Sequence, residues 1–566
     1  RKEMRRVSII TALLLLIPMF VSGQENKEDE IKRSVTLYNP YKPTLQDATK
    51  RTSFPAMDDT TKIREDVRYS FTPGDFTPVY EVSPIKPATL SPDPLQKLYK
   101  SYVNMGLGNY VSPFIEISVS NLRSKKGAIG IYTRSYASAG KISLANSDRV
   151  FAGFMDNQAI LYGRKYFNKS RFDSDIDVRQ MSRYAYGYDP AEVGYSATKK
   201  SIRSLTFDVT GRARYFNIPR DSSHLKYDLT FKYNYFSRGD TAVQNNPGIE
   251  LKGGKEVEGF YVGTDFNWDV YFFGGNLEYG ARNLFALNPY ISKGTEDWRF
   301  KFGFDFAVDV KDDPDPLVSG KYSHAYFYPD LEFTFLVVPK FLRFRMALNG
   351  NLENNQARNA IYRNPFLEHS DTLFTLRNTD NKLSLSAGLE GSFNADATYN
   401  LGVSYTLFND MLMFRNDTLG VGNFFLPCYD DGEVLRFHGE TTFPVNRHFK
   451  VTTLANYYKY SLTNFQHPWN KPQWDAMAQV DYNLRDKILA SLAINAFGDK
   501  YAMVKSPEKE SKLPVHVNLN LGLEYRYTKA LSFWAKINNI SWNRYYEWNY
   551  YPAHNFMIIG GFTYSL

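Results

Sequence analysis

Hydrophobic and polar residues alternate along most of the chain, from about Lys100 to the C-terminus. In four clear stretches, 205–215, 227–235, 300–308 and 515–527, every second residue is hydrophobic and many of the residues between are polar. Successive side chains of a β-strand point to opposite faces, so each stretch predicts a strand with one apolar and one polar face. The pattern therefore predicts an all-β protein.

The length of these stretches separates a membrane barrel from a soluble sandwich, whose strands also alternate. Alternation here holds for roughly 9 to 13 residues. A strand of a soluble protein has about 5–6 residues, whereas a tilted strand that spans a bilayer needs about 9–11. Hairpins with short turns are predicted at 383–407 and 474–496. An open sheet edge is not tolerated in hydrocarbon, so the sheet is expected to close on itself.

We therefore predict an antiparallel transmembrane β-barrel of roughly 16–22 strands. The strand number stays open, because the stretches 159–188 and 260–288 can each be divided in two ways. Short turns are expected at one end of the barrel and longer polar loops at the other. These longer loops are predicted at 312–321, 355–380, 415–431 and 498–512.

The first 23 residues have the three parts of an export signal. Arg5 and Arg6 precede the almost wholly apolar run Ile9–Val21, and small residues follow as far as Gly23. A bilayer-spanning helix needs roughly 20 apolar residues, so this shorter run favours a signal peptide over a membrane anchor. We expect Met4 to be the product of the start codon. We also expect cleavage after Gly23, which leaves the mature chain outside the inner membrane.

Residues 24–97 differ from the rest of the chain. They are rich in Lys, Asp, Thr and Pro and show little alternation. Proline removes a backbone donor and favours extended or turn conformations. The expected division is a signal peptide at 1–23, an irregular periplasmic or lumen-filling segment at 24–97, and an outer-membrane β-barrel at 98–566.

Composition agrees with a barrel and disfavours several other classes. Aromatic residues make up 16% of the chain while the mean hydropathy is −0.43, which is too polar for a helical membrane protein. The net charge of +8 comes from 68 basic residues interleaved with 60 acidic ones. This mixture is typical of a solvated surface, so nucleic acid is not expected as a partner. Cys428 is the single cysteine, so no disulfide forms within the chain.

Catalytic and metal-binding patterns are weak. His438 lies two residues from Glu440, and His369 two residues from Asp371, which places each pair on one strand face or in one loop. No HExxH or CxxC spacing occurs. We therefore expect no enzyme, no metal and no cofactor.

The polar face of the predicted strands is expected to line the lumen. Several of its residues carry charge of both signs, which predicts no simple ion selectivity. The candidate lumen-facing residues are Asp265, Asn267, Asp269, Arg343, Arg345, Glu524 and Arg526.

The final strand resembles the C-terminal signal that outer-membrane barrels present for assembly. Gly561, Phe562, Tyr564 and Leu566 occupy the glycine and hydrophobic positions of that pattern. Two positions depart from it: Leu566 replaces the usual terminal aromatic residue, and Ile559 stands where a polar residue is common. The resemblance implies the barrel-assembly machinery as a partner during biogenesis.

The last 35 or so residues resemble the end of TonB-dependent receptors. The Asn-rich step 535–540, the aromatic stretch 544–548 and Tyr551-Pro552 are similar to that family's closing strands and loop, and the general look is similar to its Bacteroidota members. A looser resemblance, in the barrel-like alternation of hydrophobic and polar residues, covers about 460 residues. The family's plug domain precedes its barrel, but only about 70 residues lie at 24–94, and 33–37 is a weak match to an energy-coupling box.

The expected function is a transport, pore or structural barrel of TonB-receptor ancestry without a full plug, in the outer membrane of a Gram-negative bacterium. The alternative is an accessory barrel subunit of an envelope assembly, secretion or lipoprotein-binding complex. Outer-membrane lipid and lipopolysaccharide are expected around the barrel. Protein partners in an envelope complex belong to the alternative.

Overall fold

The structure is a computed structural model of the whole chain. It describes residues 99–566, apart from short gaps, so the predictions for 1–97 lie outside the described residues. The gaps are 122–123, 125, 193–194, 196–197, 220–223, 240–241, 275–280, 313–320, 369–375, 394–396, 418–419 and 505–508.

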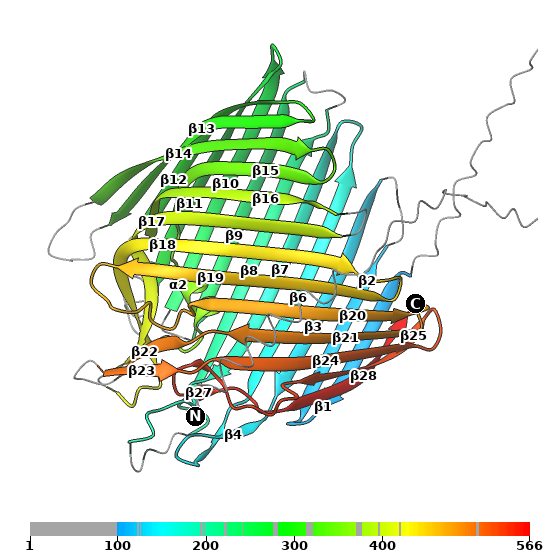
Figure 1. Cartoon of the computed structure of the whole chain (residues 1–566), viewed down its shortest axis with the longest axis vertical. Helices are drawn as coiled ribbons and strands as arrows, with labels where there is room; N and C mark the ends of the chain where they lie inside the picture. The colour runs from blue at the N-terminus through cyan, green and yellow to red at the C-terminus, as the bar shows by residue number, and fades with distance from the viewer. Residues whose placement is uncertain are drawn as a thin grey trace, which may run out of the picture. The chain divides into compact units, whose positions relative to one another are not determined.

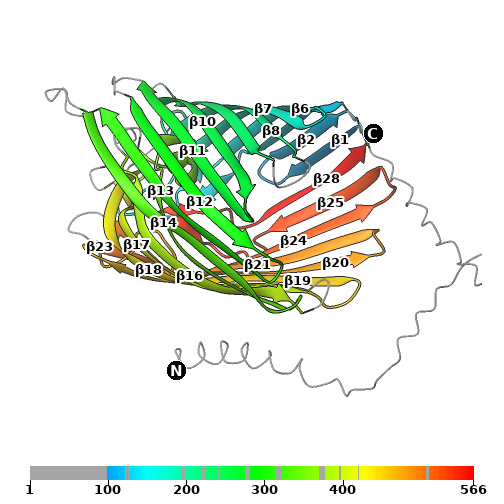
Figure 2. The ribbon, with the colours of Figure 1, turned by 90° about the horizontal axis from the view of Figure 1, so that it is seen from above.

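The described residues form one closed antiparallel barrel of 22 strands (Figure 1). Figure 2 shows the last strand, in red, beside the first, in blue. The strands are β1 (Ser101–Gly108), β2 (Ser112–Ser120), β3 (Gly127–Ser138), β6 (Phe154–Tyr166), β7 (Ser170–Tyr184), β8 (Arg203–Asn217), β9 (Lys226–Arg238), β10 (Ala242–Val257), β11 (Phe260–Gly274), β12 (Arg282–Gly294), β13 (Trp298–Asp312), β14 (Lys321–Val338), β15 (Leu342–Glu353), β16 (Thr379–Ser392), β17 (Thr398–Asn416), β18 (Phe425–Pro444), β19 (Phe449–Leu462), β20 (Trp474–Leu484), β21 (Ile488–Phe497), β24 (His516–Arg526), β25 (Leu531–Asn538) and β28 (Met557–Ser565).

Pairing between β1 and β28 closes the barrel. Tyr102 lies opposite Ser565, and the ladder continues for seven residues to Gly108 opposite Ile559. Every other barrel strand pairs with its neighbours in chain order, which gives the simplest antiparallel topology. The predicted fold class is confirmed, and the strand number lies at the upper end of the predicted range.

Hydrophobic alternation explains why these segments become strands. On β13, Phe302, Phe304 and Phe306 are 62%, 38% and 40% exposed, so these large rings point away from the protein. Lys301, which precedes Phe302 in sequence, forms an ion pair with Asp330 on the opposite face of the sheet. A soluble sheet would bury its phenylalanines, whereas a barrel in a bilayer turns them outward.

The barrel has two different ends. The turn end carries the start of β1, the C-terminus and ten short connections, and here the Lys100 N–H donates to the Leu566 carbonyl at 2.7 Å. One is the predicted turn 485–487, where Arg485 and Asp486 have φ of 52° and 55°. Such left-handed residues suit tight hairpins. The loop end carries the other eleven connections, which include the longer ones.

Three hairpins and one helix lie in the loop-end connections. The helix α2 (Ala357–Arg363) follows β15. Within the described residues, no helix is long and apolar enough to cross a membrane. The hairpins are β4 (Lys141–Ser143) with β5 (Arg149–Phe151), β22 (Lys500–Val504) with β23 (Lys509–Leu513), and β26 (Tyr546–Trp548) with β27 (Tyr551–Pro552).

Two predicted loops were partly wrong. The range 415–431 is mostly strand, because β17 and β18 stay paired as far as Asn416 opposite Phe425 and leave only 417–424 between them. The range 498–512 contains the hairpin of β22 and β23. Both hairpins continue into residues whose polarity no longer alternates, so the ladder persists where the strand pattern is lost. The ambiguous stretches 159–188 and 260–288 divide into β6 with β7 and β11 with β12.

Candidate functional site

The connection 354–378, here called the inner loop, crosses the loop end of the barrel. On α2, Arg358 and Tyr362 both donate to Asp208 of β8, at 2.8 and 2.7 Å. Further along the inner loop, Arg377 forms an ion pair with Asp410 of β17 at 2.7 Å. Because β8 and β17 belong to different parts of a closed wall, the inner loop extends across the mouth between them.

An apolar cluster forms beneath the inner loop, and we call it the loop-end core. On α2, Ala357, Ala360 and Ile361 are each 1% exposed, because their spacing places them on one side of the helix. The wall supplies residues from five strands and the inner loop adds two more. The other members are Met181, Phe236, Ala242, Leu367, Leu376, Leu412, Phe414, Phe425 and Tyr551.

Tyr551 joins a second loop to this core. It lies in the connection 539–556, is 2% exposed and stacks on Phe366 of the inner loop with ring centroids 3.8 Å apart. Its hydroxyl donates to the Asn423 carbonyl, so three loops meet at one side chain. Burial raises the pKa of Tyr551 well above its usual range. The Tyr-Pro pair was visible in the sequence, but its place at the centre of the loop-end core was not predicted.

Two arginines beneath the loops were also missed. Arg238 of β9 is 0% exposed and donates to Ser204 Oγ at 2.8 Å and to the Pro365 carbonyl of the inner loop at 3.2 Å. Arg282 of β12 forms a buried ion pair with Asp309 and donates to the Leu376 carbonyl at 3.2 Å. Each arginine ties the barrel wall to the inner loop. Sequence alone gives no signal for partners so distant along the chain.

Ion pairs cover the same face of the wall farther from the loop end. Between β7 and β10, charged residues line a cavity of about 420 Å³. Lys232 lies among Glu250, Asp269 and Asn267, at 2.9, 3.1 and 3.4 Å from its Nζ. Opposite charges alternate from strand to strand, so they neutralise one another locally. This cavity is lined by Asp173, Asp175, Arg212, Arg214, Asp228, Thr230, Lys232, Glu250 and Lys252.

The structure divides the seven candidate lumen residues into three groups. Asn267 and Asp269 meet at Lys232, and Asp265 lies on the same face of β11, opposite Lys252 in register. The remaining four form pairs on distant strands. On β15, Arg343 and Arg345 pair with Glu390 and Glu332 at 3.5 and 3.3 Å, and on β24 Arg526 pairs with Glu524 at 3.3 Å.

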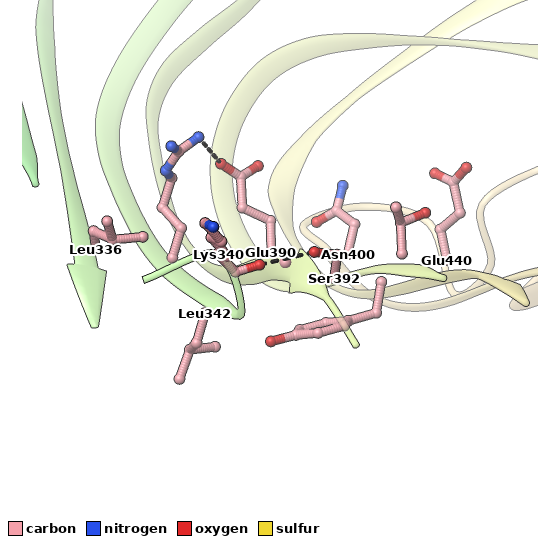
Figure 3. Close-up of a pocket in the computed structure, with 11 residues that line it drawn as sticks. Leu336, Lys340, Leu342, Glu390, Ser392, Asn400 and Glu440 are labelled. Atoms are coloured by element: carbon pink, nitrogen blue, oxygen red, sulfur yellow. Dashed lines mark hydrogen bonds and ion pairs between the residues drawn. The ribbon is translucent and has the colours of Figure 1, made fainter. Parts of the chain in front are cut away.

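Two adjoining cavities surround the β15 arginines near the turn end. One of about 630 Å³ is lined by Arg343, Glu390 and Glu440, and one of about 520 Å³ shares Arg343 and Glu390 and adds Arg345. Figure 3 shows Glu390, Asn400 and Glu440 extending to one side of the sheet and Leu342 to the other. This region is a partly exposed surface that carries charge of both signs.

A larger turn-end cavity of about 810 Å³ lies beside the seam between β1 and β28. Arg447, His448, Lys450 and Lys536 make its lining more basic than that of the other cavities. Trp534 gives it an aromatic wall and donates its indole N–H to Asn104 Oδ1 at 2.6 Å. Asp481 and Glu524 also line this cavity, so it carries charge of both signs.

The weak catalytic pairs gain no support from geometry. His438 Nδ1 lies 2.9 Å from Asn456 Oδ1, and Glu440, two residues further along β18, lines the cavity of about 630 Å³. His369 and Asp371 lie outside the described residues. No group of three or more His, Cys, Asp or Glu side chains in the described part of the chain could hold a metal ion.

The C-terminal residues take part in barrel closure. A Cβ on Gly561 would lie 2.0 Å from the Met105 carbonyl, so this close approach of β28 to β1 requires glycine. Phe562, Tyr564 and Leu566 are 39%, 42% and 58% exposed and lie on one face of β28. Recognition by an assembly machinery stays a prediction.

No protein-family model and no curated protein matches the chain. Solved structures do match. The ferric-catecholate import receptor Fiu from E. coli K12 has a TM-score of 0.61 at 10% identity, with 83% of this chain and 82% of that chain covered. The FrpB iron transporter from Neisseria meningitidis has a TM-score of 0.65 at 9% identity, with the same coverage. The copper transporter OprC has a TM-score of 0.64 at 9% identity, covering 83% and 80%.

This chain has the barrel fold of TonB-dependent outer-membrane receptors. These solved structures are receptors and transporters rather than enzymes. At such low identity the likeness concerns the fold, so substrate, partners and mechanism need arguments from this chain's own residues.

Proposed function

We propose that the chain is an outer-membrane barrel of TonB-receptor ancestry, without a full plug, that transports a solute through its lumen. The observation that carries the proposal is the contrast between a polar, ion-paired inner face and an apolar loop-end core within a 22-strand barrel. Barrels of this size have a wide lumen that is normally blocked. In this chain the inner loop and the connection 539–556, which carries Tyr551, block the lumen at the loop end.

The seven candidate residues line this lumen in the proposal. Arg179 and Met181 on β7 contact α2 and the loop-end core, so their face of the wall points inward. Lys232 of β9 forms ion pairs with both Glu250 of β10 and Asp269 of β11. A solute would therefore meet paired charges of both signs, which favours polar solutes with mixed hydrogen-bonding groups over simple ions.

Residues 24–97 lie outside the described residues, and we propose that they form an irregular periplasmic or lumen-filling segment. Their tyrosines and prolines, among them Tyr38 and Tyr41, favour an extended peptide over a compact domain.

Conductance in planar bilayers tests the transport proposal. Replacing Ala357–Leu367 by a Gly-Ser linker removes α2 and its contacts while the 22 strands remain. We expect the native chain to conduct little and this variant to conduct several-fold more. An equally low conductance, for a variant that still shows the heat-modifiable mobility of a folded barrel, would contradict a lumen blocked by the inner loop.

A second function, an accessory subunit of an envelope complex, is favoured by the same closure. A barrel whose described loops interlock through Tyr551 suits a structural role as well as transport. Extraction in mild detergent distinguishes the two. Stoichiometric copurification of other envelope proteins, together with no conductance from the linker variant, would favour the accessory role.

A further inference from the structure

A patch of polar side chains lies on the outward face of β3, β6 and β7, which follow one another around the wall (Figure 1). Ser135, Asn157 and Gln180 are register partners on these three strands. Ser135 Oγ donates to Asn157 Oδ1 at 2.7 Å, and Asn157 Nδ2 donates to Gln180 Oε1 at 3.2 Å. We call these three residues the outer amide row.

The neighbours of Gln180 establish that the row faces outward. Arg179 lies over the ring of Tyr362 on α2, and Met181 belongs to the loop-end core. Both therefore point into the barrel. Strand side chains alternate, so Gln180 and its register partners Asn157 and Ser135 point to the outside.

Apolar residues surround the row. Ile115 lies opposite Ser135 on one side and Phe207 opposite Gln180 on the other, and they are 40% and 38% exposed. Along the strands the outward neighbours are mostly small or apolar, apart from Ser182, which is 1% exposed and accepts a hydrogen bond from Arg203. The remaining neighbours are Thr133, Ala137, Met155, Ala159 and Val178.

The side-chain amide of Gln180 lies at the end of the row. Gln180 accepts from Asn157, and no described residue accepts a hydrogen bond from Gln180 Nε2. An amide N–H without an acceptor is unfavourable in an apolar environment, and lipid acyl chains offer none. The described part of the chain therefore leaves this donor available to a partner in the membrane.

We propose that the outer amide row is the contact between two copies of this chain side by side in the membrane. A primary amide has both donors and an acceptor, so it can pair with its own copy across a two-fold axis. The Gln180 carbonyl has a second lone pair for this purpose. The small outward residues Ala137 and Ala159 let the two walls approach, as small residues do at other membrane contacts.

The inference rests on the proposed membrane location but not on transport. Replacing Asn157 and Gln180 by leucine should remove the contact without harming the barrel, because leucine suits a lipid-facing position. Cys428 is the single cysteine of the chain and is buried, so the native protein serves as the control without cross-linking.

Cysteine cross-linking in native membranes tests the proposal. Ala159→Cys lies next to the row and leaves it intact, whereas Phe327→Cys, where the native ring is 66% exposed, samples the wall at β14. We expect Ala159→Cys to give at least ten-fold more covalent dimer than Phe327→Cys. We expect Ala159→Cys/N157L/Q180L to fall to the level of Phe327→Cys.

Native mass spectrometry from nanodiscs provides the second measurement. A dimer mass for the native chain and a monomer mass for the N157L/Q180L variant support the proposal. A monomer mass for the native chain, equal cross-linking at both cysteines, or cross-linking to a different protein would overturn it. A folded monomer in the nanodisc would still leave the membrane barrel itself intact, so the two proposals fail separately.

Discussion

The loop end and the turn end of the barrel use similar residues in different surroundings. At the loop end, the side chains of Arg282 and Asp309 are 9% and 8% exposed and adjoin the inner loop. Near the turn end, those of Arg343 and Glu390 are 47% and 37% exposed and line an open cavity. Removing one member of a buried ion pair leaves a buried charge without a partner, whereas water solvates the remaining member of an exposed pair. Stability is therefore expected to concentrate at the loop end.

The largest effect should come from the buried pair. We expect Arg282→Ala to lower the free energy of unfolding by about 3–5 kcal/mol, because Asp309 would stay buried without its partner. Arg343→Ala should lower it by only about 0–1 kcal/mol. Urea unfolding in lipid vesicles measures both variants. Equal losses would show that the two ends do not differ in this way.

The loop-end core itself is the next target. Tyr551→Ala should cost about 3–5 kcal/mol of local stability, since a buried ring and its stacking on Phe366 are lost. Tyr551→Phe keeps the ring and should cost about 1 kcal/mol for the hydrogen bond to Asn423. Hydrogen exchange of the inner loop reports both. If Tyr551→Ala leaves exchange there unchanged, the loop does not depend on this core.

Away from the outer amide row, the outer face should be apolar, and a charge placed there tests this. Phe304→Arg places a cation among lipid-facing rings and should cost about 2–4 kcal/mol. Asp305→Arg, on the next residue but the inner face, should cost much less. Folded yield after refolding into vesicles measures the difference. Comparable yields would mean that the faces have been assigned wrongly.

The smallest expected effect is on pH dependence. Burial lowers the pKa of Lys500, which lies in the β22 hairpin at the loop end, from its usual 10.5. The unfolded chain then binds more protons, so stability should rise with pH between the lowered folded pKa and about 10.5. Lys500→Met should remove this rise. An unchanged profile in Lys500→Met would contradict the assignment.

The barrel wall was predictable from sequence because its cause is local. The alternation of Phe300 to Phe306 specifies a strand by itself, and the turn at Arg485 specifies a hairpin. Prediction failed where strands extend beyond the alternating stretch. The pair Asn416 and Phe425 keeps its ladder where hydrophobic and polar residues no longer alternate, so 415–431 looked like a loop.

The loop-end core was not predictable, because its contacts are distant along the chain. Arg238 meets a serine 34 residues away and a proline carbonyl 127 residues away. One signal was present: Ala357, Ala360 and Ile361 have the spacing of an amphipathic helix. This signal lay in a stretch that was predicted to be a polar loop, so the crossing of the inner loop over the barrel mouth was not predicted. The candidate lumen residues were chosen by alternation alone, which identifies a face but not a binding site.

Cysteine accessibility tests the closed loop end most directly. Arg345→Cys places a thiol on the polar face of β15, next to a cavity near the turn end, while the native Cys428 is buried. A bulky, membrane-impermeant maleimide is added to intact cells. We predict no labelling of Arg345→Cys, and strong labelling once Ala357–Leu367 is also replaced by a Gly-Ser linker. Labelling of Arg345→Cys on intact cells with the inner loop in place would contradict a lumen sealed at the loop end.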